Sequence, residues 1–293
     1  MQLRLALQAG LETLLRRSVP SAQLAAELLL MHVLGRDRAY LHTHAELELP
    51  QTTVDRYSKL IGERAAGKPT QYITGHQEFW GMDFEVTPDV LIPRPETEHL
   101  VESVLELVRA QGFGKDRRLR IADVGTGSGC IALALASELP RAIIFGVDIS
   151  RTALVVASDN AVRLGMPERV KFLESDLLSR LLDADFLGTF DFVVSNPPYV
   201  GKHEVDMVQR EVREFEPRVA WGGLEQGDEI YARLFPQAFQ VLKPGGYVVV
   251  EIGYNMRDVV LRLLGEEWEE IEVRPDLAGI PRVVYARKRR PGG

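Results

Sequence analysis

A glycine-rich run is the first stretch of the sequence that suggests chemistry. Its five residues are Gly125, Thr126, Gly127, Ser128 and Gly129. Glycine has no Cβ, so the backbone can turn sharply here and approach a bound molecule closely. Asp148 follows at the end of the next apolar run, where a carboxylate can accept hydrogen bonds from both ribose hydroxyls of a nucleoside. Together these features predict a nucleoside site; the alternative is a plain tight turn, with Asp148 capping a helix.

Two further acids indicate which nucleoside binds. Residues 127–132 fit the G-x-G-x-x-G/A pattern of dinucleotide sites, which is weak on its own. Asp123 precedes the glycines, and Asp176, followed by Leu177, comes after a third apolar run. The ammonium and adenine amino groups of S-adenosylmethionine are donors that need acceptors, whereas a pyrophosphate disfavours nearby carboxylates. S-adenosylmethionine is therefore the expected cofactor.

The motif Asn196-Pro197-Pro198-Tyr199 is the most specific signal in the chain. Two prolines lack N–H groups and fix φ, so the loop presents a rigid set of carbonyl acceptors. The amide oxygen of Asn196 and the carbonyl of Pro197 can accept both protons of a planar NH₂ group, while the Tyr199 ring stacks on its π-system. We expect these four residues to be catalytic, with Asn196 also beside the cofactor; the alternative is a proline-rich strand exit with a buried tyrosine.

A nitrogen of this kind is a poor nucleophile because its lone pair is delocalised. Holding its N–H groups out of the favoured plane restores electron density toward a sulfonium methyl, so positioning and electrostatics can supply the acceleration.

No Ser/His/Asp triad and no metal is needed, and Cys130 is expected to be a packing residue. Four histidines also have no metal-ligand spacing with carboxylates or the cysteine, so we do not expect them to bind a metal: His32, His42, His44 and His76.

Alternating strands and helices must position these motifs. The expected strands are Arg120–Val124, 142–147, 170–173, Phe190–Ser195 and 246–252, followed by 271–273 and 282–286. The first five are separated by helical stretches, such as Cys130–Glu138, and predict a parallel sheet covered on both faces. The last two have no helix between them and should be antiparallel at one edge. The fold class is therefore α/β, with a doubly wound, mostly parallel, seven-stranded sheet.

Two smaller regions precede this sheet. Residues 1–74 have apolar spacings typical of four or five helices, with Ser21 as a helix cap and with Gly35 and Pro50 between helices. Residues 75–92 change to a period of two around Gly81, which predicts a hairpin linker. Residues 93–293 then form the catalytic domain.

Composition excludes several classes. The 293 residues are 45% hydrophobic and 26% charged, with one cysteine, as in ordinary globular proteins without disulfides. No apolar run is long enough to cross a membrane, and no secretion signal is evident, so we expect a cytoplasmic protein without a membrane partner. Residues 1–75 carry a net charge of +2 and the remainder −9, which disfavours a general nucleic-acid binder.

These motifs resemble class I S-adenosylmethionine-dependent methyltransferases that act on amino groups. Over nearly the whole chain the sequence is more similar to the release-factor glutamine N5-methyltransferases of the HemK/PrmC family. Besides the motifs above, the resemblance includes residues 91–98, Leu-Ile-Pro-Arg-Pro-Glu-Thr-Glu, then Glu216-Pro217 and Gly222-Gly223. The sequence departs from the family pattern at residues 224–227, Leu-Glu-Gln-Gly, where an acidic residue followed by Gly-Leu is more usual.

The resemblance implies a substrate as well as a cofactor. S-adenosylmethionine would be held by residues 125–129 and Asp148, with Asp176 and Leu177 beside its adenine. Residues 196–199 would hold the glutamine amide of the GGQ motif in a class I peptide-chain release factor. The helical region would dock this protein substrate, and the enzyme is expected to be a monomer.

Three other functions fit some of the same residues. A DNA or RNA adenine-N6 methyltransferase would place a flipped adenine amino group in the same loop, but would be expected to carry a basic recognition domain. A nicotinamide-dependent oxidoreductase leaves the Asn-Pro-Pro-Tyr motif without a role. A non-enzymatic nucleoside-binding module is the third alternative.

Overall fold

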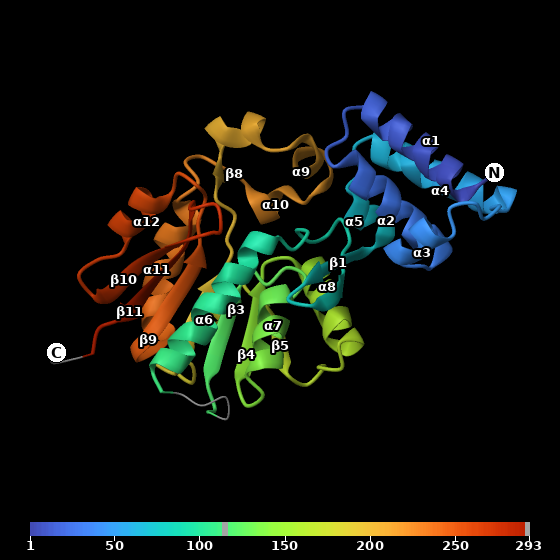
Figure 1. Ribbon diagram of the computed structural model, residues 1–293. Coiled ribbons are helices and arrows are strands. Elements are labelled where there is room, and N and C mark those ends of the chain that lie inside the picture. The colour runs from blue at the N-terminus through green and yellow to red at the C-terminus, as the bar shows by residue number, and fades with distance from the viewer. Residues whose placement is uncertain (113–116, 291–293) are drawn as a thin grey trace. The chain divides into compact units, whose positions relative to one another are not determined.

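The computed structural model describes residues 1–112 and 117–290 (Figure 1). The chain forms two compact units. The helical unit comprises Met1–His76 together with Gln209–Phe215, and the sheet unit comprises Gln77–Val208 and Glu216–Gly293. The helical unit therefore contains a short segment that comes from much later in the sequence.

The helical unit is built around three longer helices. Its elements are α1 (Leu3–Arg16), α2 (Ala22–Leu34), α3 (Arg38–Thr43), α4 (Gln51–Ala65), α5 (Thr70–Thr74) and α9 (Arg210–Phe215). Apolar side chains of α1, α2 and α4 form one core, including Leu14, Leu29 and Tyr57. The buried Tyr57 hydroxyl donates a hydrogen bond to the Ala26 carbonyl at 3.2 Å, which satisfies its polar group inside this core. Five helices within residues 1–74 agree with the expected four or five.

One ion pair joins α9 to the rest of the helical unit. Arg64 on α4 is only 4% exposed. Its Nη2 lies 2.5 Å from Glu211 Oε1, and its Nη1 donates to the Lys68 carbonyl at 3.2 Å. Because an unpaired buried charge is costly, Glu211 is a required part of this unit.

Most of the expected helix boundaries are found, with one error. Gly35 ends α2 in the left-handed conformation (φ 62°), and Pro50 directly precedes α4. Ser21 precedes α2, but it has φ 49° and its side chain makes no capping hydrogen bond. A capping side chain normally reaches the first helical N–H groups from an extended backbone. The prediction that Ser21 caps this helix is therefore wrong.

A hairpin is present in the region predicted to contain one. Strands β1 (His76–Phe79) and β2 (Met82–Glu85) form a two-stranded sheet. Between them Trp80 and Gly81 have φ values of 55° and 67°. Two successive positive φ values match the twist of a tight hairpin. Phe79 and Phe84 are buried in the core of the sheet unit.

The sheet unit contains the predicted doubly wound sheet. Its seven strands are β3 (Arg120–Val124), β4 (Ile143–Asp148), β5 (Val170–Glu174), β6 (Phe190–Ser195), β9 (Leu242–Glu251), β10 (Trp268–Pro275) and β11 (Pro281–Lys288). They lie in the order β10-β11-β9-β6-β3-β4-β5. The five strands from β9 to β5 are parallel, and β11 is antiparallel to both β9 and β10. The antiparallel edge is thus confirmed.

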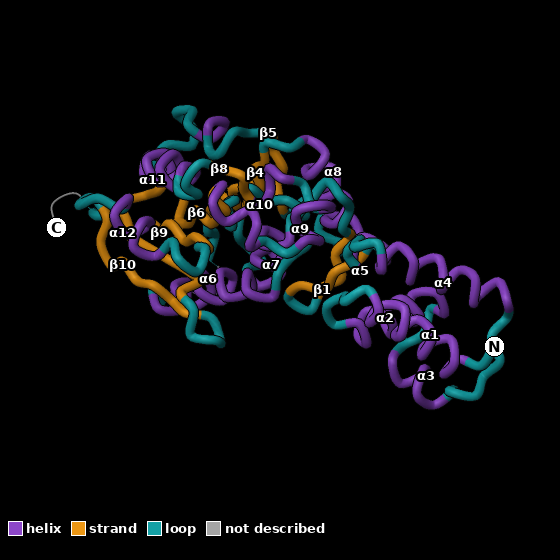
Figure 2. The backbone as a smooth tube through the Cα atoms, turned by 90° about the horizontal axis from the view of Figure 1, so that it is seen from above, coloured by secondary structure: helices purple, strands orange, loops and turns teal. Residues whose placement is uncertain are grey.

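Helices cover both faces of the sheet. They are α6 (Glu98–Ala110), α7 (Cys130–Glu138), α8 (Arg151–Arg163), α11 (Glu229–Val241) and α12 (Arg257–Leu263). Side chains of α6 and α7 pack in one core, and those of α11 and α12 pack in the other. Figure 2 shows α6 and α7 on one side of the strands and α11 on the other. None of the helices in the described ranges is long and apolar enough to cross a membrane.

Short elements complete the sheet unit near the carboxyl ends of the strands. They are the 3₁₀ turns η1 (Pro95–Thr97), η2 (Ser179–Leu181) and η3 (Lys202–Met207), the helix α10 (Arg218–Trp221), and the paired strands β7 (Val200–Gly201) and β8 (Gly222–Leu224). The strand order reverses between β3 and β6, whose last residues Val124 and Ser195 are paired. Such a switch point is where open α/β sheets bind ligands.

Candidate active site

A cavity of about 490 Å³ lies at the carboxyl ends of β3, β4 and β6. It brings together segments that are far apart in the sequence. Of the predicted site residues, its walls contain Gly125, Thr126, Gly127, Ser128, Asp148, Asp176, Leu177, Asn196, Pro197 and Pro198. Gly129 and Tyr199 do not line it. The loops that follow parallel strands meet at one sheet edge, which is why the motifs converge here.

The glycines of the loop have different roles. Gly125, Gly127 and Gly129 have φ values of 72°, 54° and 81°, a region that other residues rarely adopt. A Cβ on Gly125 or Gly127 would meet no heavy atom closer than 4.0 Å, so both face open space. A Cβ on Gly129 would lie 3.2 Å from Ala157 Cβ on α8. Two glycines thus leave room for a ligand, and the third permits close helix packing.

Asp148 has free acceptor capacity at the cavity wall. Its Oδ2 accepts a hydrogen bond from the Gly127 amide at 2.9 Å, and its Oδ1 accepts one from the Ser150 amide at 2.9 Å. A carboxylate has about four acceptor sites, so each oxygen can accept another donor. Burial raises the pKa of Asp148, while these backbone hydrogen bonds lower it. The residue can therefore shape the glycine loop and still bind a ribose diol.

Asp123 lies behind the cavity wall. It is fully buried, and its Oδ2 accepts a hydrogen bond from Thr126 Oγ1 at 2.6 Å. In the described part of the chain its Oδ1 has no hydrogen-bond partner. Burial raises the pKa of Asp123 to about 7, although Thr126 and the backbone amide of Ala132 act in the opposite direction. This carboxyl therefore positions Thr126, which does line the cavity.

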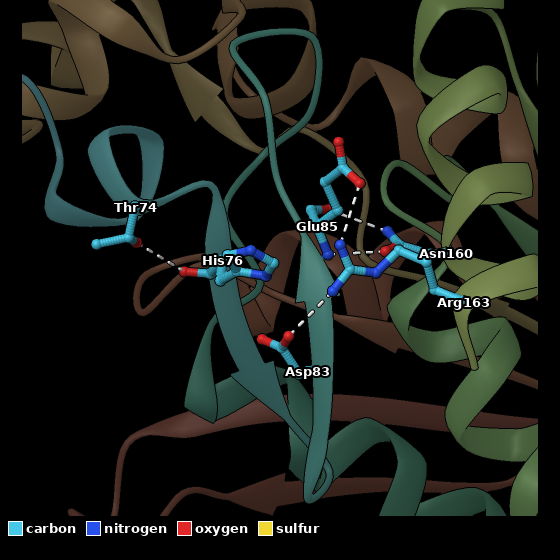
Figure 3. Close-up of polar contacts among 6 residues, drawn as sticks. All are labelled: Thr74, His76, Asp83, Glu85, Asn160 and Arg163. Carbon is cyan, nitrogen blue, oxygen red and sulfur yellow. Dashed lines mark hydrogen bonds and ion pairs between the residues drawn. The ribbon is translucent and has the colours of Figure 1, made fainter. Parts of the chain in front are cut away.

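A buried asparagine holds the glycine loop from behind. Asn160 Oδ1 accepts a hydrogen bond from the Glu85 amide at 2.7 Å, and its Nδ2 donates to the carbonyls of Glu85 and Ser128, each at 3.0 Å. Figure 3 shows Asn160 beside Glu85 on β2, with Arg163 reaching both Glu85 and Asp83. The hairpin, α8 and the glycine loop are thus connected by one side chain. Sequence reasoning missed this residue.

One part of the cavity wall suits a flat, partly apolar ring. Asp176 is half-exposed, and its Oδ2 lies 2.5 Å from Arg233 Nη2. Leu177, which has φ 51°, lines the same wall, as does Ile149. Ile149 is 57% exposed, which is high for a large apolar side chain. An adenine ring would cover it, and Asp176 would provide an acceptor nearby.

Asn196 and its neighbours form another part of the cavity wall. Asn196 Nδ2 donates a hydrogen bond to Thr97 Oγ1 at 3.1 Å. Within the described ranges Asn196 Oδ1 has no protein donor, so it remains an open acceptor on a residue that lines the cavity. Pro197 and Pro198 continue this wall.

Tyr199 is not among the described residues that line the cavity. It packs against the core beneath α11 and α12, and a Cβ on Gly253 would lie 3.0 Å from its ring. Its hydroxyl donates to Glu251 Oε1 at 3.4 Å. The ring thus packs in this core, and its stacking on a substrate stays a prediction.

Glu251 was also missed by the sequence reasoning. It ends β9, is 1% exposed, and its Oε2 accepts a hydrogen bond from Thr97 Oγ1 at 2.6 Å. Burial raises the pKa of Glu251 to about 7, against the opposing effects of Thr97 and Arg282. The sequence feature that could have identified it is an acidic residue near the end of the apolar run 246–252.

A second buried glutamate joins two loops of the cavity. Glu216 Oε1 lies 2.5 Å from Arg94 Nη2, and its Oε2 accepts a hydrogen bond from the Ile92 amide at 3.2 Å. Arg94 lines the cavity, as do Arg218 and Gly222. The Leu-Ile-Pro-Arg and Glu-Pro motifs therefore act together to close one side of the site. In the described ranges no group of three or more His, Cys, Asp or Glu residues could hold a metal ion.

Family models match two parts of the chain. The PrmC N-terminal domain matches residues 6–75, and the methyltransferase small domain matches residues 107–224. Among solved structures, a 16S rRNA N2 G1207 methyltransferase of Thermus thermophilus, in complex with AdoMet and guanosine, covers 73% of this chain and 50% of its own. Its TM-score is 0.52 and its identity 20%, which shows a shared fold.

Curated relatives match the whole chain. The release factor glutamine methyltransferase of Koribacter versatilis is 51% identical over 98% of this chain and 99% of its own. That of Moorella thermoacetica is 41% identical over 99% of each chain, and that of Nitratidesulfovibrio vulgaris is 38% identical over 92% of this chain and 90% of its own. With the fold and the cavity above, these similarities show that the chain belongs to the release factor glutamine methyltransferase family.

Proposed function

We propose that the protein transfers a methyl group from S-adenosylmethionine to the side-chain amide nitrogen (N5) of a glutamine in a class I peptide-chain release factor. The observation that carries this proposal is the open acceptor Asn196 Oδ1 in the same cavity as the glycine loop. The carbonyl of Pro197 offers a second acceptor. Two acceptors in one rigid loop suit the two N–H groups of a primary amide.

The cofactor would occupy the other part of the cavity. Gly125, Thr126, Gly127 and Ser128 would lie along it, and Gly129 would support them from behind. Asp148 would accept the ribose hydroxyls. Asp176 and Leu177 would flank the adenine ring. Both the open space above two glycines and the free lone pairs of Asp148 support this fit.

When bound, the cofactor supplies an electrophilic methyl group on a positively charged sulfur. The protein residues hold the acceptor nitrogen in line with that methyl group. Asn196 and Pro197 would fix the two N–H groups, which limits conjugation of the nitrogen with its carbonyl. The proline-rich loop is rigid before the substrate arrives, so little ordering is needed at the moment of reaction.

We also propose that the helical unit docks the release factor. Its sequence carries a small net positive charge, unlike the acidic remainder of the chain. The enzyme would act as a cytoplasmic monomer and without a nucleic-acid partner. Deleting residues 1–74 would also remove Arg64, the partner of Glu211, so a deletion would not test docking alone. The test therefore replaces exposed basic residues of this unit, such as Arg16 and Arg17. Slower transfer to the intact release factor with unchanged cofactor affinity would support docking; an unchanged transfer rate for every such variant would contradict it.

The central experiment compares substrates with wild type and Asn196→Ala. Label from S-adenosylmethionine is followed into release factor, into release factor with its target glutamine replaced, and into adenine-containing oligonucleotides. We expect label in the first alone, and about a hundredfold loss of turnover in Asn196→Ala, because one positioning hydrogen bond is removed. Cofactor affinity, measured by calorimetry, should fall much less. Label in the oligonucleotides would instead support the adenine-N6 alternative.

A further inference from the structure

Three polar side chains form a chain of hydrogen bonds that ends at Asn196. Glu251 Oε2 accepts from Thr97 Oγ1 at 2.6 Å, and Thr97 Oγ1 accepts from Asn196 Nδ2 at 3.1 Å. Thr97 and Glu251 are 2% and 1% exposed. Glu251 lies outside the residues that line the cavity, whereas Thr97 and Asn196 line it. Glu251 can therefore act on a substrate only through its neighbours.

When Glu251 is ionised, the chemistry of the three groups fixes the direction of these hydrogen bonds. An ionised carboxylate has no proton to donate, so the single hydroxyl proton of Thr97 must point to Glu251. Toward Asn196, the Thr97 oxygen can then only accept a hydrogen bond. Of the two ends of the Asn196 amide, only the NH₂ end can donate to a lone pair. The NH₂ end must face Thr97, and the oxygen must face the other way.

The second oxygen of Glu251 supports the same arrangement. Oε1 accepts from the Tyr199 hydroxyl at 3.4 Å. Both carboxylate oxygens thus act as acceptors, one for Thr97 and the other for Tyr199. Burial has the largest effect and raises the pKa of Glu251 to about 7, with the nearby Glu96 acting in the same direction, while the hydrogen bonds from Thr97 and Tyr199 and the charge of Arg282 favour the ionised form.

We propose that Glu251 is a positioning residue that sets which end of the Asn196 amide faces the substrate. With the oxygen outward, the site accepts hydrogen bonds from a glutamine NH₂ and repels a carboxylate. With the amide reversed, its NH₂ group would clash with a substrate NH₂ group and would donate to a carboxylate instead. Through Thr97, the buried carboxylate would therefore specify glutamine over glutamate. This inference rests on the proposed function, because it assumes that a glutamine side chain enters the cavity.

The test measures this selectivity as a ratio of affinities. The probes are release factor and release factor with its target glutamine replaced by glutamate, both titrated by calorimetry with S-adenosylhomocysteine present so that no transfer occurs. The measured quantity is the Kd for the glutamate form divided by the Kd for the glutamine form. A change that only loosens packing would weaken both forms alike and leave the ratio unchanged.

Two variants remove the constraint at different points. In Glu251→Met the Thr97 hydroxyl loses its carboxylate acceptor and can donate to Asn196 Oδ1 instead, so the amide should reverse. In Thr97→Val the Asn196 amide loses its partner and can take either orientation. We expect the ratio to fall about 10- to 100-fold in Glu251→Met, because a hydrogen bond to the substrate NH₂ is replaced by repulsion between two NH₂ groups, and to fall less in Thr97→Val.

Two controls accompany these variants. Thr97→Ser keeps the hydroxyl and should keep the ratio of the wild type. Ser158→Ala removes an exposed hydroxyl on α8 that donates to the Leu154 carbonyl, away from the cavity, and should also keep it. Each variant is first shown to be folded by its thermal shift with S-adenosylhomocysteine, and if Glu251→Met does not fold, the Thr97→Val and Thr97→Ser pair still tests the inference.

The possible outcomes separate the two proposals. If the wild type prefers the glutamine form but Glu251→Met and Thr97→Val keep the full preference, the role of Glu251 is refuted and the proposed function stands. If the wild type itself does not distinguish the two forms, and transfers no methyl group to the glutamine form, the proposed function fails first. A lower ratio in both variants, with Thr97→Ser unchanged, supports the inference.

Discussion

Replacing Asp123 by asparagine should remove one defined part of the pH dependence of stability. Asp123 is fully buried, and burial raises its pKa from 3.8 to about 7. In the unfolded chain this carboxyl is ionised above about pH 4, whereas in the folded protein it keeps its proton until near pH 7. The folded state therefore binds more protons over this range, and the free energy of unfolding falls as the pH rises.

The size of the effect follows from the shift. One pKa unit corresponds to about 1.4 kcal/mol, and about two units lie between pH 5 and the raised pKa. Taking the protein from pH 5 to pH 8.5 should therefore cost about 3 kcal/mol of stability through Asp123 alone. This contribution is fully present below the unfolded pKa and is lost as the pH rises through about 7. Asp123→Asn cannot ionise and should lack it.

Urea unfolding at pH 5 and pH 8.5 measures this contribution. The three tryptophans, Trp80, Trp221 and Trp268, all belong to the sheet unit, so their fluorescence reports the unit that contains Asp123. The difference between the two pH values is compared for wild type, Asp123→Asn and the exposed-site control Asp55→Asn. Other buried acids, including Glu251, contribute equally to all three proteins. If Asp123→Asn showed the same pH dependence as wild type, the assigned pKa shift would be wrong.

Three other changes give separate outcomes. Asp148→Ala should weaken S-adenosylmethionine binding about ten- to a hundredfold for each ribose hydrogen bond lost, and unchanged calorimetric affinity would exclude it from the site. Asn160→Leu should lower the free energy of unfolding by about 1–3 kcal/mol for each backbone group of Glu85 or Ser128 left unpaired, and an unaltered urea midpoint would show that those groups find other partners. The preference for glutamine over glutamate should increase from pH 6 to pH 8 as Glu251 ionises, and a flat profile in wild type would argue that its carboxylate is not involved.

Much of the sheet could be predicted because each strand is a local pattern. Runs such as Phe190–Ser195 are apolar along their whole length, as expected for strands buried on both faces. The glycine loop and the Asn-Pro-Pro motif were also recognisable locally, since their chemistry lies in consecutive residues. These features alone placed the site at the carboxyl edge of the sheet.

The rest depends on partners that are distant in sequence. Glu251 is 154 residues from Thr97, and Asn160 is 75 residues from Glu85. A buried acid or amide looks like a surface residue until its partner is known. The same limit applies to Tyr199, because the acceptor of its hydroxyl, Glu251, is 52 residues away. Ser21 was misjudged for a local reason, because its positive φ is unusual for serine.

The contribution of α9 to the helical unit has a consequence for protein synthesis. Glu211 follows Arg64 by 147 residues, so the first five helices leave the ribosome long before their last partner is made. At 5–20 residues per second this interval is about 7–30 s. During this time the Arg64 guanidinium must stay hydrated or find another anion. The nascent helical unit should therefore be a more open species than the finished one, and should close only when the chain has passed through most of the parallel sheet.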